Sequence, residues 1–290
     1  MDIERVGVVG CGLMGSGIAE VCARAGADVV VREPTEALLT AGRERVGQSL
    51  ARAARAGKLT GDEEQAALAN ITYTKDWGAM ADRQLVLEAV TEDADDKLAV
   101  YRELDRHVAA DDAILASNTS SIPIMKLAMA TSRPAQVIGI HFFNPVPVLR
   151  LVELVTSLLT SDEVAGRAEA YVTTALGKRV IRSQDRAGFV VNSLLIPYIL
   201  SAIRMFESGF ASRDDIDTGM VEGCAHPMGP LALADLIGLD TTMAVAASLY
   251  EEFKEPLYAA PPLLSRMVEA NLLGRKTGRG FYDHQRRPAG

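Results

Sequence analysis

The sequence predicts a doubly wound α/β domain of the Rossmann type, with a mostly parallel sheet, followed by an all-helical C-terminal domain. Short apolar segments alternate with helical patterns up to about residue 183, which is typical of a parallel sheet covered by helices on both faces. A glycine-rich turn joins the first strand to the first helix. From Gly188 onward only helical patterns remain, which indicates a second domain.

The first domain follows the alternation expected of βαβ units. Gly26 ends its first helix, and a helical pair at about 35–69 is an insertion relative to a minimal βαβ unit. Strands are expected at 5–10, 28–33, 70–74, 84–90, 113–117, 137–142 and 178–183. Helices are expected at 11–26, 35–58, 61–69, 94–108, 122–130 and 162–176.

The change of pattern predicts a domain boundary near 184–188, and hence domains at 1–185 and 186–290. The first helix of the second domain contains FVVNSLLIPYIL and is apolar on more than one face. We expect such a helix to be buried against both its own domain and a partner subunit. Helices of this domain are expected near 189–209, 213–222, 230–236, 239–254 and 261–273.

Composition is that of an acidic globular protein. The chain has 290 residues, 48% hydrophobic and 23% charged, with a net charge of −8. Nucleic acid is not expected as the main partner because phosphate binding needs a basic face, although a small phosphorylated ligand is compatible. Three cysteines without metal or disulfide spacing favour a reducing, cytoplasmic setting. No targeting peptide or membrane span is expected: the first strand begins near Met1, and the run at 189–200 is short and interrupted.

A glycine-rich run, GCGLMG at 10–15, lies directly after the first strand and opens the first helix. Glycine-rich turns are common, but this position predicts a dinucleotide site. The first two glycines allow a tight turn and let the backbone approach a pyrophosphate, and the third permits close helix–strand packing. The expected cofactor residues of the run are Gly10, Gly12, Leu13, Met14 and Gly15.

Glu33 ends the second strand, 18 positions beyond Gly15. Its carboxylate can accept both hydroxyls of an adenosine ribose and would repel a 2′-phosphate, which favours NAD over NADP. The neighbouring Arg32 leaves NADP possible, because a guanidinium could stabilise that phosphate. Alternatively, Arg32 is a solvated charge at the end of a strand.

Polar residues follow two apolar segments between 117 and 153. Ser120, His141, Asn144 and Glu153 supply a hydroxyl, an imidazole, an amide and a carboxylate. Ends of parallel strands are where open α/β sheets bind ligands. A carboxylate on the far nitrogen of an imidazole would fix its tautomer for general acid–base catalysis. Taken alone, His141 favours a core histidine bonded to backbone, but the cluster reverses that preference in favour of a catalytic site. No group of residues has metal-ligand spacing.

Together these motifs resemble the L-3-hydroxyacyl-CoA dehydrogenase family, in particular its short bacterial 3-hydroxybutyryl-CoA dehydrogenases. The resemblance extends from Val6 to Tyr282. It includes GCGLMGSGIAE at 10–20, LEAVTED at 87–93, SNTSSIPI at 117–124, HFFNPVPVLRLVEL at 141–154, GFVVNSLLIPY at 188–198, HPMGPLALADLIGLD at 226–240 and GRKTGRGFY at 274–282. It implies a dinucleotide-binding first domain and a helical second domain that makes the contact of a homodimer.

The resemblance also implies roles for individual residues. His141 corresponds to the catalytic base, Glu153 to its orienting carboxylate, and Ser120 and Asn192 to groups that hold the substrate 3-oxygen. Four further residues correspond to positions that line the dinucleotide: Glu92, Lys97, Asn144 and Lys276. For Glu92 and Lys97, a solvated helix start is an equally good interpretation from the sequence alone.

The acyl-CoA contact is less defined by the sequence. Ser49 matches a family position that contacts the CoA phosphates, but Ala56 occupies the position of a family lysine. Arg52, Arg55 and Lys58 flank it, and the spacing of 52 and 55 puts both guanidiniums on one helix face. That face could receive the CoA phosphates or could be an ordinary solvated face.

The expected function is NAD-dependent, reversible oxidation of a short-chain L-3-hydroxyacyl-CoA, such as 3-hydroxybutyryl-CoA, to the 3-oxoacyl-CoA. One alternative is a dehydrogenase of the same fold that acts on a free hydroxy acid or a carrier-protein thioester. Another is a non-catalytic cofactor-binding or structural protein. Acyl-chain length, physiological direction and pathway do not follow from the sequence.

Overall fold

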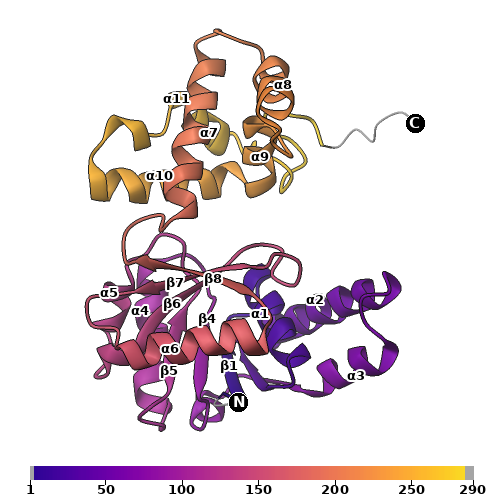
Figure 1. Ribbon diagram of the computed structural model, residues 1–290, viewed down its shortest axis with the longest axis vertical. Helices are drawn as coiled ribbons and strands as arrows, with labels where there is room; N and C mark the ends of the chain where they lie inside the picture. The colour runs from indigo at the N-terminus through magenta and orange to yellow at the C-terminus, as the bar shows by residue number, and fades with distance from the viewer. Residues whose placement is uncertain (1–2, 285–290) are drawn as a thin grey trace. The chain divides into compact units, whose positions relative to one another are not determined.

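The chain divides into two compact units, Met1–Arg186 and Ala187–Gly290, and the computed structural model describes residues 3–284. The strands found in that range form one eight-stranded sheet in the first unit, with the order β3-β2-β1-β4-β5-β6-β7-β8 (Figure 1). Neighbouring strands are parallel except β6 and β7, which are antiparallel. The strands are β1 (Arg5–Val9), β2 (Asp28–Arg32), β3 (Ile71–Thr74), β4 (Leu85–Glu88), β5 (Ile114–Ser117), β6 (Val137–Phe142), β7 (Leu151–Thr156) and β8 (Arg179–Gln184).

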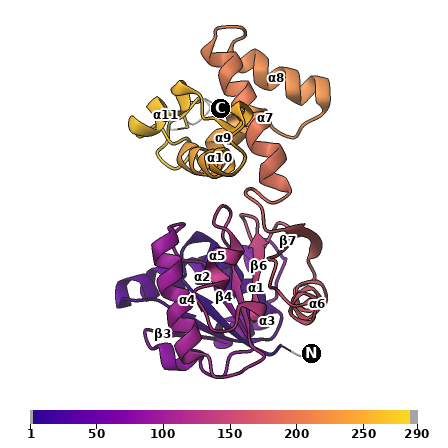
Figure 2. The ribbon, with the colours of Figure 1, turned by 90° about the vertical axis from the view of Figure 1, so that its left-hand side faces the viewer.

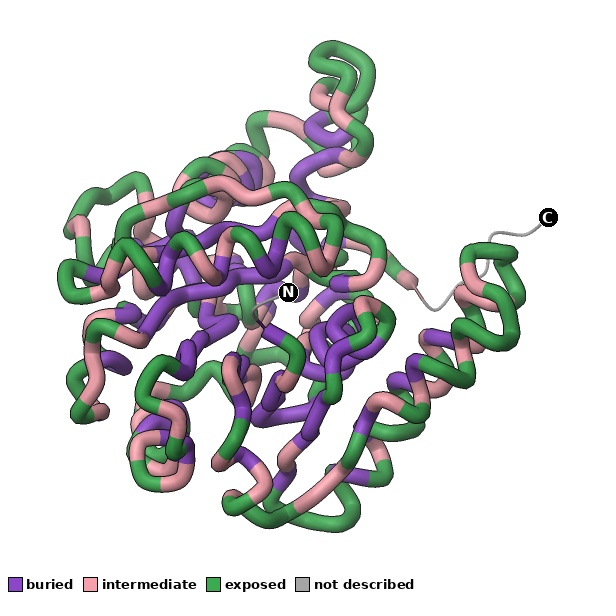
Figure 3. The backbone as a smooth tube through the Cα atoms, turned by 60° about the horizontal axis from the view of Figure 1, so that its bottom comes forward, coloured by how far each residue is buried: buried purple, intermediate pink, exposed green. Residues whose placement is uncertain are grey.

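Helices cover both faces of the sheet, with α4 and α5 on one side and α1 and α6 on the other (Figure 2). The inner strands β4, β5 and β6 are buried along their whole length, as expected of apolar strands between two helical layers (Figure 3). The helices of this unit are α1 (Leu13–Arg24), α2 (Glu36–Arg55), α3 (Gly61–Ala69), η1 (Trp77–Met80), α4 (Ala94–His107), α5 (Ile124–Ala128), η2 (Pro134–Gln136), α6 (Asp162–Ala170) and the π-helix η3 (Tyr171–Ala175).

The predicted fold class is confirmed, with one strand more than the sequence predicts. The sequence predicts no strand between 142 and 178, whereas β7 occupies Leu151–Thr156 between β6 and β8. Its burial on both faces removes the alternation that marks a half-buried strand. The single predicted helix at 162–176 is α6 followed by the π-helical turn η3.

The helical pair α2 and α3 packs against α1 (Figure 1). Thr35 caps α2 by accepting a hydrogen bond from the Leu38 N–H. Thr60 and Glu63 form a capping box at the start of α3. In the turn between the two helices, the N–H groups of Gly57 and Lys58 donate hydrogen bonds to the carbonyl oxygens of Ala54 and Ala53, so local hydrogen bonds fix this turn together with the capping box.

The second unit is helical in its described part. Its apolar core includes Ile199, Leu200 and Ile203 of α7 and Leu249 of α10. The C-terminal segment is tied to α9 by Asp235, which is fully buried and accepts hydrogen bonds from the N–H groups of Phe281 and Tyr282, both at 2.9 Å. The helices are α7 (Val191–Glu207), α8 (Arg213–Cys224), α9 (Pro230–Ile237), α10 (Leu239–Phe253), η4 (Pro256–Tyr258) and α11 (Pro262–Glu269).

Among the described residues, no single helix has the length and hydropathy needed to cross a membrane. One bent pair, Pro230–Ile237 with Leu239–Phe253, meets those two criteria when its helices are taken together, and its two helices are 97° apart.

Candidate active site

The backbone register of β6 and β7 pairs His141 with Glu153. The two residues are direct neighbours across the antiparallel strands, so their side chains point to the same side of the sheet. His141 Nδ1 lies 2.7 Å from Glu153 Oε2. The histidine is 4% exposed and the glutamate is fully buried. His141 lies within β6, which extends to Phe142, and its position next to Glu153 is determined by β7, the strand that the sequence does not predict.

Ser120 meets the other side of the imidazole. Its Oγ lies 2.9 Å from His141 Nε2, so the hydroxyl, imidazole and carboxylate form one hydrogen-bonded series. Ser120 lies in the loop after β5 and is itself half-buried. The structure thus brings together three of the four residues expected to be catalytic.

Glu92 holds the loop that carries Ser120. Its Oε1 accepts hydrogen bonds from the N–H groups of Ser120 and Ser121, at 2.9 and 3.0 Å, and from the hydroxyl of Thr119. Burial raises the pKa of the Glu92 carboxyl, but the charge of Lys97 and these hydrogen bonds outweigh that effect and lower the pKa below its usual value. Glu92 is therefore a carboxylate that fixes the backbone beside the imidazole.

Lys97 is buried rather than at a solvated helix start, with only 1% of its side chain exposed. Its Nζ lies 2.6 Å from Glu88 Oε1 and 3.2 Å from Glu92 Oε2. The other oxygen of Glu88 accepts a hydrogen bond from Ser117 Oγ at 2.6 Å. Buried charges require such pairing, so this cluster connects β4, β5 and α4 beneath the Ser120 loop.

The glycine-rich turn has the geometry of a phosphate-binding loop. Gly10 has a φ of +91°, and a Cβ there would lie 2.6 Å from the carbonyl oxygen of Ala89. A Cβ on Gly15 would lie 1.8 Å from the Gly10 carbonyl oxygen, so the helix approaches the strand as closely as expected. Gly12 is the N-cap of α1 without a side-chain cap, and a Cβ on it would project into open space. The start of α1 can therefore accept an anion.

Glu33 and Arg32 lie at the carboxyl end of β2. Glu33 is buried and accepts a hydrogen bond from the Cys11 N–H, which places the carboxylate against the glycine-rich turn. The Arg32 guanidinium lies 4.0 Å above the ring of Trp77. Burial lowers the pKa of Arg32 while the Glu33 charge opposes that shift. Arg32 is therefore stacked on an indole rather than a solvated charge.

A cavity of about 150 Å³ contains several of the expected ligand-contacting residues. Asn144, Ser49 and Arg52 line it, together with Leu13 from the start of α1. Lys58 instead lines a neighbouring cavity of about 460 Å³. Arg55 lines neither of these two cavities. The basic face expected from the spacing is thus divided among three different surroundings.

Asn192 and Lys276 belong to the second unit. Asn192 is half-buried in the first turn of α7. Lys276 is exposed, and its Nζ donates hydrogen bonds to both carboxylate oxygens of Asp240, at 2.8 and 3.0 Å. Met14 lies in the first turn of α1, half-buried.

No group of three or more His, Cys, Asp or Glu side chains with metal-binding geometry occurs among residues 3–284. The sequence does not predict that Glu88 and Ser117 take part in the site, although they support it from below. Their position at the ends of two apolar strands could have indicated it, because a buried glutamate or serine requires hydrogen-bonding partners.

Comparison with known proteins identifies the family. The family model for the NAD binding domain of 3-hydroxyacyl-CoA dehydrogenase matches residues 5–186, and the model for its C-terminal domain matches residues 188–284. A 3-hydroxybutyryl-CoA dehydrogenase from Mycobacterium tuberculosis is 60% identical, over 97% of this chain and 99% of that protein. The human mitochondrial hydroxyacyl-coenzyme A dehydrogenase is 39% identical, over 98% of this chain and 92% of that protein.

Solved structures agree with the sequence relatives. The crystal structure of FadB2 from M. tuberculosis has a TM-score of 0.97 at 60% identity, covering 98% of this chain and 99% of that one. The (S)-3-hydroxybutyryl-CoA dehydrogenase PaaH1 from Ralstonia eutropha has a TM-score of 0.93 at 46% identity, covering 98% and 100%. With a glycine-rich NAD-binding domain, a buried imidazole–carboxylate pair and these relatives, the chain belongs to the 3-hydroxyacyl-CoA dehydrogenase family of NAD-dependent oxidoreductases.

Proposed function

We propose that this protein reversibly oxidises short-chain L-3-hydroxyacyl-CoA, with 3-hydroxybutyryl-CoA among its best substrates, to 3-oxoacyl-CoA. The observation that carries the proposal is the hydrogen-bonded series Ser120–His141–Glu153. Relatives named 3-hydroxybutyryl-CoA dehydrogenase over nearly the whole chain support the choice of substrate.

His141 is the proposed acid–base group. An N–H at Nδ1 donating to the buried Glu153 carboxylate leaves Nε2 as an acceptor. In that tautomer Nε2 can take the proton of a substrate hydroxyl and return it in the reverse reaction. Glu153 stabilises the imidazolium that forms and, being fixed by the strand register, keeps the ring oriented.

Ser120 and Asn192 are the proposed ligands of the substrate 3-oxygen. Ser120 Oγ is already within hydrogen-bonding distance of His141 Nε2, so an oxygen held by the hydroxyl would also meet the imidazole. Asn192 offers an amide N–H from the first turn of α7. Two donors on one oxygen would stabilise charge that develops there.

The NAD site is proposed at the start of α1. The open space above Gly12 and the uncapped helix N-terminus fit a pyrophosphate, and Glu33 beside the turn fits a ribose diol. NAD supplies the hydride acceptor when bound. We assign Asn144 and Lys276 to contacts with the cofactor. We assign Lys97 a positioning role instead of a direct contact, because its ammonium pairs with Glu92, which holds the Ser120 loop.

The test of the catalytic assignment is His141→Gln, assayed as NADH oxidation with acetoacetyl-CoA. We expect kcat to fall roughly 10²–10⁴-fold, the usual contribution of a positioned acid–base group. NAD binding and the circular dichroism spectrum should be unchanged. His107→Gln is the matched control, because His107 lies at the end of α4, away from the Ser120 loop. A His141→Gln variant that keeps more than about a third of the wild-type rate would refute the assignment.

The substrate and the acyl carrier require a panel. Hydroxyacyl-CoAs from C4 to C16, free 3-hydroxybutyrate and a carrier-protein thioester should be compared with NAD and with NADP. We expect the highest kcat/KM with C4 acyl-CoA and NAD. A free acid or a carrier-protein thioester as the best substrate would favour the alternative dehydrogenase, and no turnover of any of them would favour a non-catalytic protein.

We also propose a homodimer formed through the helical unit. Apolar side chains are exposed on that unit, including Leu194 of α7 at 73% and Phe210 at 79%. We infer that these side chains belong to the subunit contact, because apolar surface gathered on one unit marks a protein–protein interaction site. Light scattering should give twice the chain mass of 31.0 kDa, and Leu194→Glu should shift the mass toward a monomer. The equally apolar Leu158→Glu in the first unit, where Leu158 is 94% exposed, should not. A wild-type mass near 31.0 kDa would contradict the dimer.

A cytoplasmic location is proposed as well, because Cys11, Cys22 and Cys224 are all unpaired in the structure. Fractionation of cells that make the protein would test it.

A further inference from the structure

The only tryptophan of the chain lies against the arginine that ends β2. The guanidinium carbon of Arg32 is 4.0 Å from the centroid of the Trp77 ring. Its Nε is buried and has no hydrogen-bond partner among residues 3–284. Burial lowers the pKa of Arg32, and the charges of Glu33 and Glu103 oppose that shift. An aromatic face attracts a cation, and more strongly where water is excluded, so the indole offsets the loss of water on that side of the guanidinium.

Trp77 is held in position by its own segment and by α4. It is the first residue of η1, and Asp76 before it accepts a hydrogen bond from the Gly78 N–H at 2.9 Å. The Asp76 N–H donates to Thr74 Oγ1 at 3.0 Å, which ties this turn to the end of β3. The indole also stacks on the His107 imidazole, with ring centroids 6.3 Å apart and ring planes 12° from parallel. Local hydrogen bonds and α4 thus fix the ring that Arg32 contacts.

Arg32 and Glu33 point to opposite faces of the sheet. Successive residues of a strand alternate between faces, and the Glu33 carboxylate lies against the glycine-rich turn. Gly7 of β1 is paired with Val30, two residues before the arginine, and shares its face. A Cβ on Gly7 would lie 2.6 Å from Met80 Sδ, so η1 covers that face. The carboxylate is therefore directed toward the proposed cofactor turn and the guanidinium toward η1.

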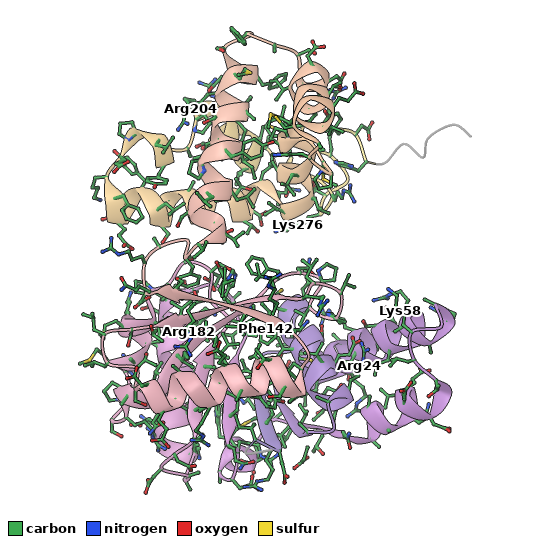
Figure 4. The ribbon with its side chains drawn as sticks, in the orientation of Figure 1. Arg24, Lys58, Phe142, Arg182, Arg204 and Lys276 are labelled. Atoms are coloured by element: carbon green, nitrogen blue, oxygen red, sulfur yellow. The ribbon has the colours of Figure 1, made fainter. Side chains whose placement is uncertain are left out.

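The stacked guanidinium is also directed away from the ligand-binding edge of the sheet. Open α/β sheets bind ligands at the carboxyl ends of their strands, an edge that Phe142 at the end of β6 marks in Figure 4. The helix α4 connects the parallel strands β4 and β5, so it starts at this edge and runs back across the sheet. At 1.5 Å per residue its 14 residues span about 21 Å. His107, which stacks on Trp77, is the last of them.

We propose that Trp77 is a positioning residue that sets the preference for NAD over NADP, by holding Arg32 on its ring and away from the 2′ position of the adenosine ribose. This inference rests on the proposed NAD site at the start of α1, and it adds a second determinant to Glu33. Without the ring, the long side chain of Arg32 could turn over the end of β2, where a guanidinium would bind a 2′-phosphate. With the ring, the site presents the Glu33 carboxylate, which accepts hydrogen bonds from a ribose diol and repels a phosphate.

The test measures the dissociation constants of NAD and NADP by calorimetry, without substrate, in four variants. Trp77→Ala should lower the ratio of the NADP constant to the NAD constant about tenfold, about 1.4 kcal/mol, because it frees the guanidinium. Trp77→Phe keeps an aromatic face and should keep the wild-type ratio. Arg32→Met should keep the ratio within about twofold of wild type, because the stacked charge lies on the other face and is screened. Trp77→Ala combined with Arg32→Met should lose the gain in NADP binding.

Three results would overturn the inference. A ratio that Trp77→Ala leaves unchanged would mean that the freed guanidinium does not reach the phosphate. A gain that persists in the double variant would mean that the ring acts without Arg32. Weaker NADP binding in Arg32→Met alone would mean that the stacked guanidinium already contacts the phosphate.

The test remains decisive if Trp77→Ala folds poorly. Trp77→Leu, which keeps an apolar side chain without a ring, then takes its place, and Arg32→Met tests the stack without changing the ring. The proposed NAD site fails separately, if the wild-type protein binds neither dinucleotide.

Discussion

Replacing Lys97 by Met should destabilise the first unit, because it removes the partner of a buried charge. Glu88 is fully buried, and its Oε1 lies 2.6 Å from Lys97 Nζ. Removing one member of a buried ion pair costs about 3–5 kcal/mol. Glu88 would keep its hydrogen bonds from Ser117 Oγ and the Val90 N–H, at 2.6 and 2.8 Å, so we expect a loss of about 3 kcal/mol, near the lower end.

The assay is urea unfolding followed by tryptophan fluorescence. Trp77 is the only tryptophan of the chain and lies in the first unit, so its signal reports the unfolding of that unit. Lys126→Met is the matched control, because Lys126 is exposed on α5 and should change stability by less than about 0.5 kcal/mol. Adding Glu88→Gln to Lys97→Met should recover part of the loss, since the unpaired charge disappears. A decrease in the free energy of unfolding of less than about 1 kcal/mol in Lys97→Met would show that Glu88 and Lys97 do not form a charged pair.

Three further predictions follow from single residues. Glu33→Ala should narrow or abolish a preference for NAD over NADP in kcat/KM, and a wild-type protein that prefers NADP would contradict the assignment. Burial raises the pKa of Glu20, with Ser49, Arg24 and Arg52 opposing, so the contribution of Glu20 to the free energy of unfolding falls as the pH rises above about 4.3, and Glu20→Gln removes this loss. The advantage of that variant in urea unfolding should therefore be larger at pH 7 than at pH 4, and the opposite trend would refute it. Burial raises the pKa of Cys11 to about 12 and of Cys22 to about 11, so a thiol reagent should label no more than one cysteine, Cys224, before unfolding and all three in urea. Rapid labelling of two or more in the native protein would contradict that burial.

Most of the fold can be predicted from local sequence patterns. The exception is β7, whose place in the sheet depends on contacts outside its own segment. The glycine-rich turn, the helical pair and the later helices leave periodic or capping signals that depend on neighbours in the sequence. The segment LVELVT at 151–156 has no alternation, because β6 and β8 flank it and both of its faces are covered. Its other neighbour, β8, follows only after α6 and η3, so nothing next to the segment in the sequence indicates that it is an inner strand.

The sequence predicts which residues form the candidate site better than it predicts the surroundings of each one. Ser120, His141 and Glu153 were expected to act together, and they are hydrogen-bonded. Lys97 was expected at a helix start facing solvent or cofactor, whereas it is buried against Glu88. A lysine carries no local signal of burial, because its environment is set by the strand end that precedes its helix by several residues.

The pairing of His141 with Glu153 across β6 and β7 also bears on how the sheet reaches its correct alignment. A slip of one residue between these strands would turn every side chain of β7 to the opposite face. Glu153 would then be buried among apolar groups, away from the imidazole that it contacts in the native alignment. An isolated buried carboxylate costs several kcal/mol, so the misaligned sheet is penalised at this position. The same carboxylate that orients the imidazole therefore discriminates against incorrect strand pairing during folding.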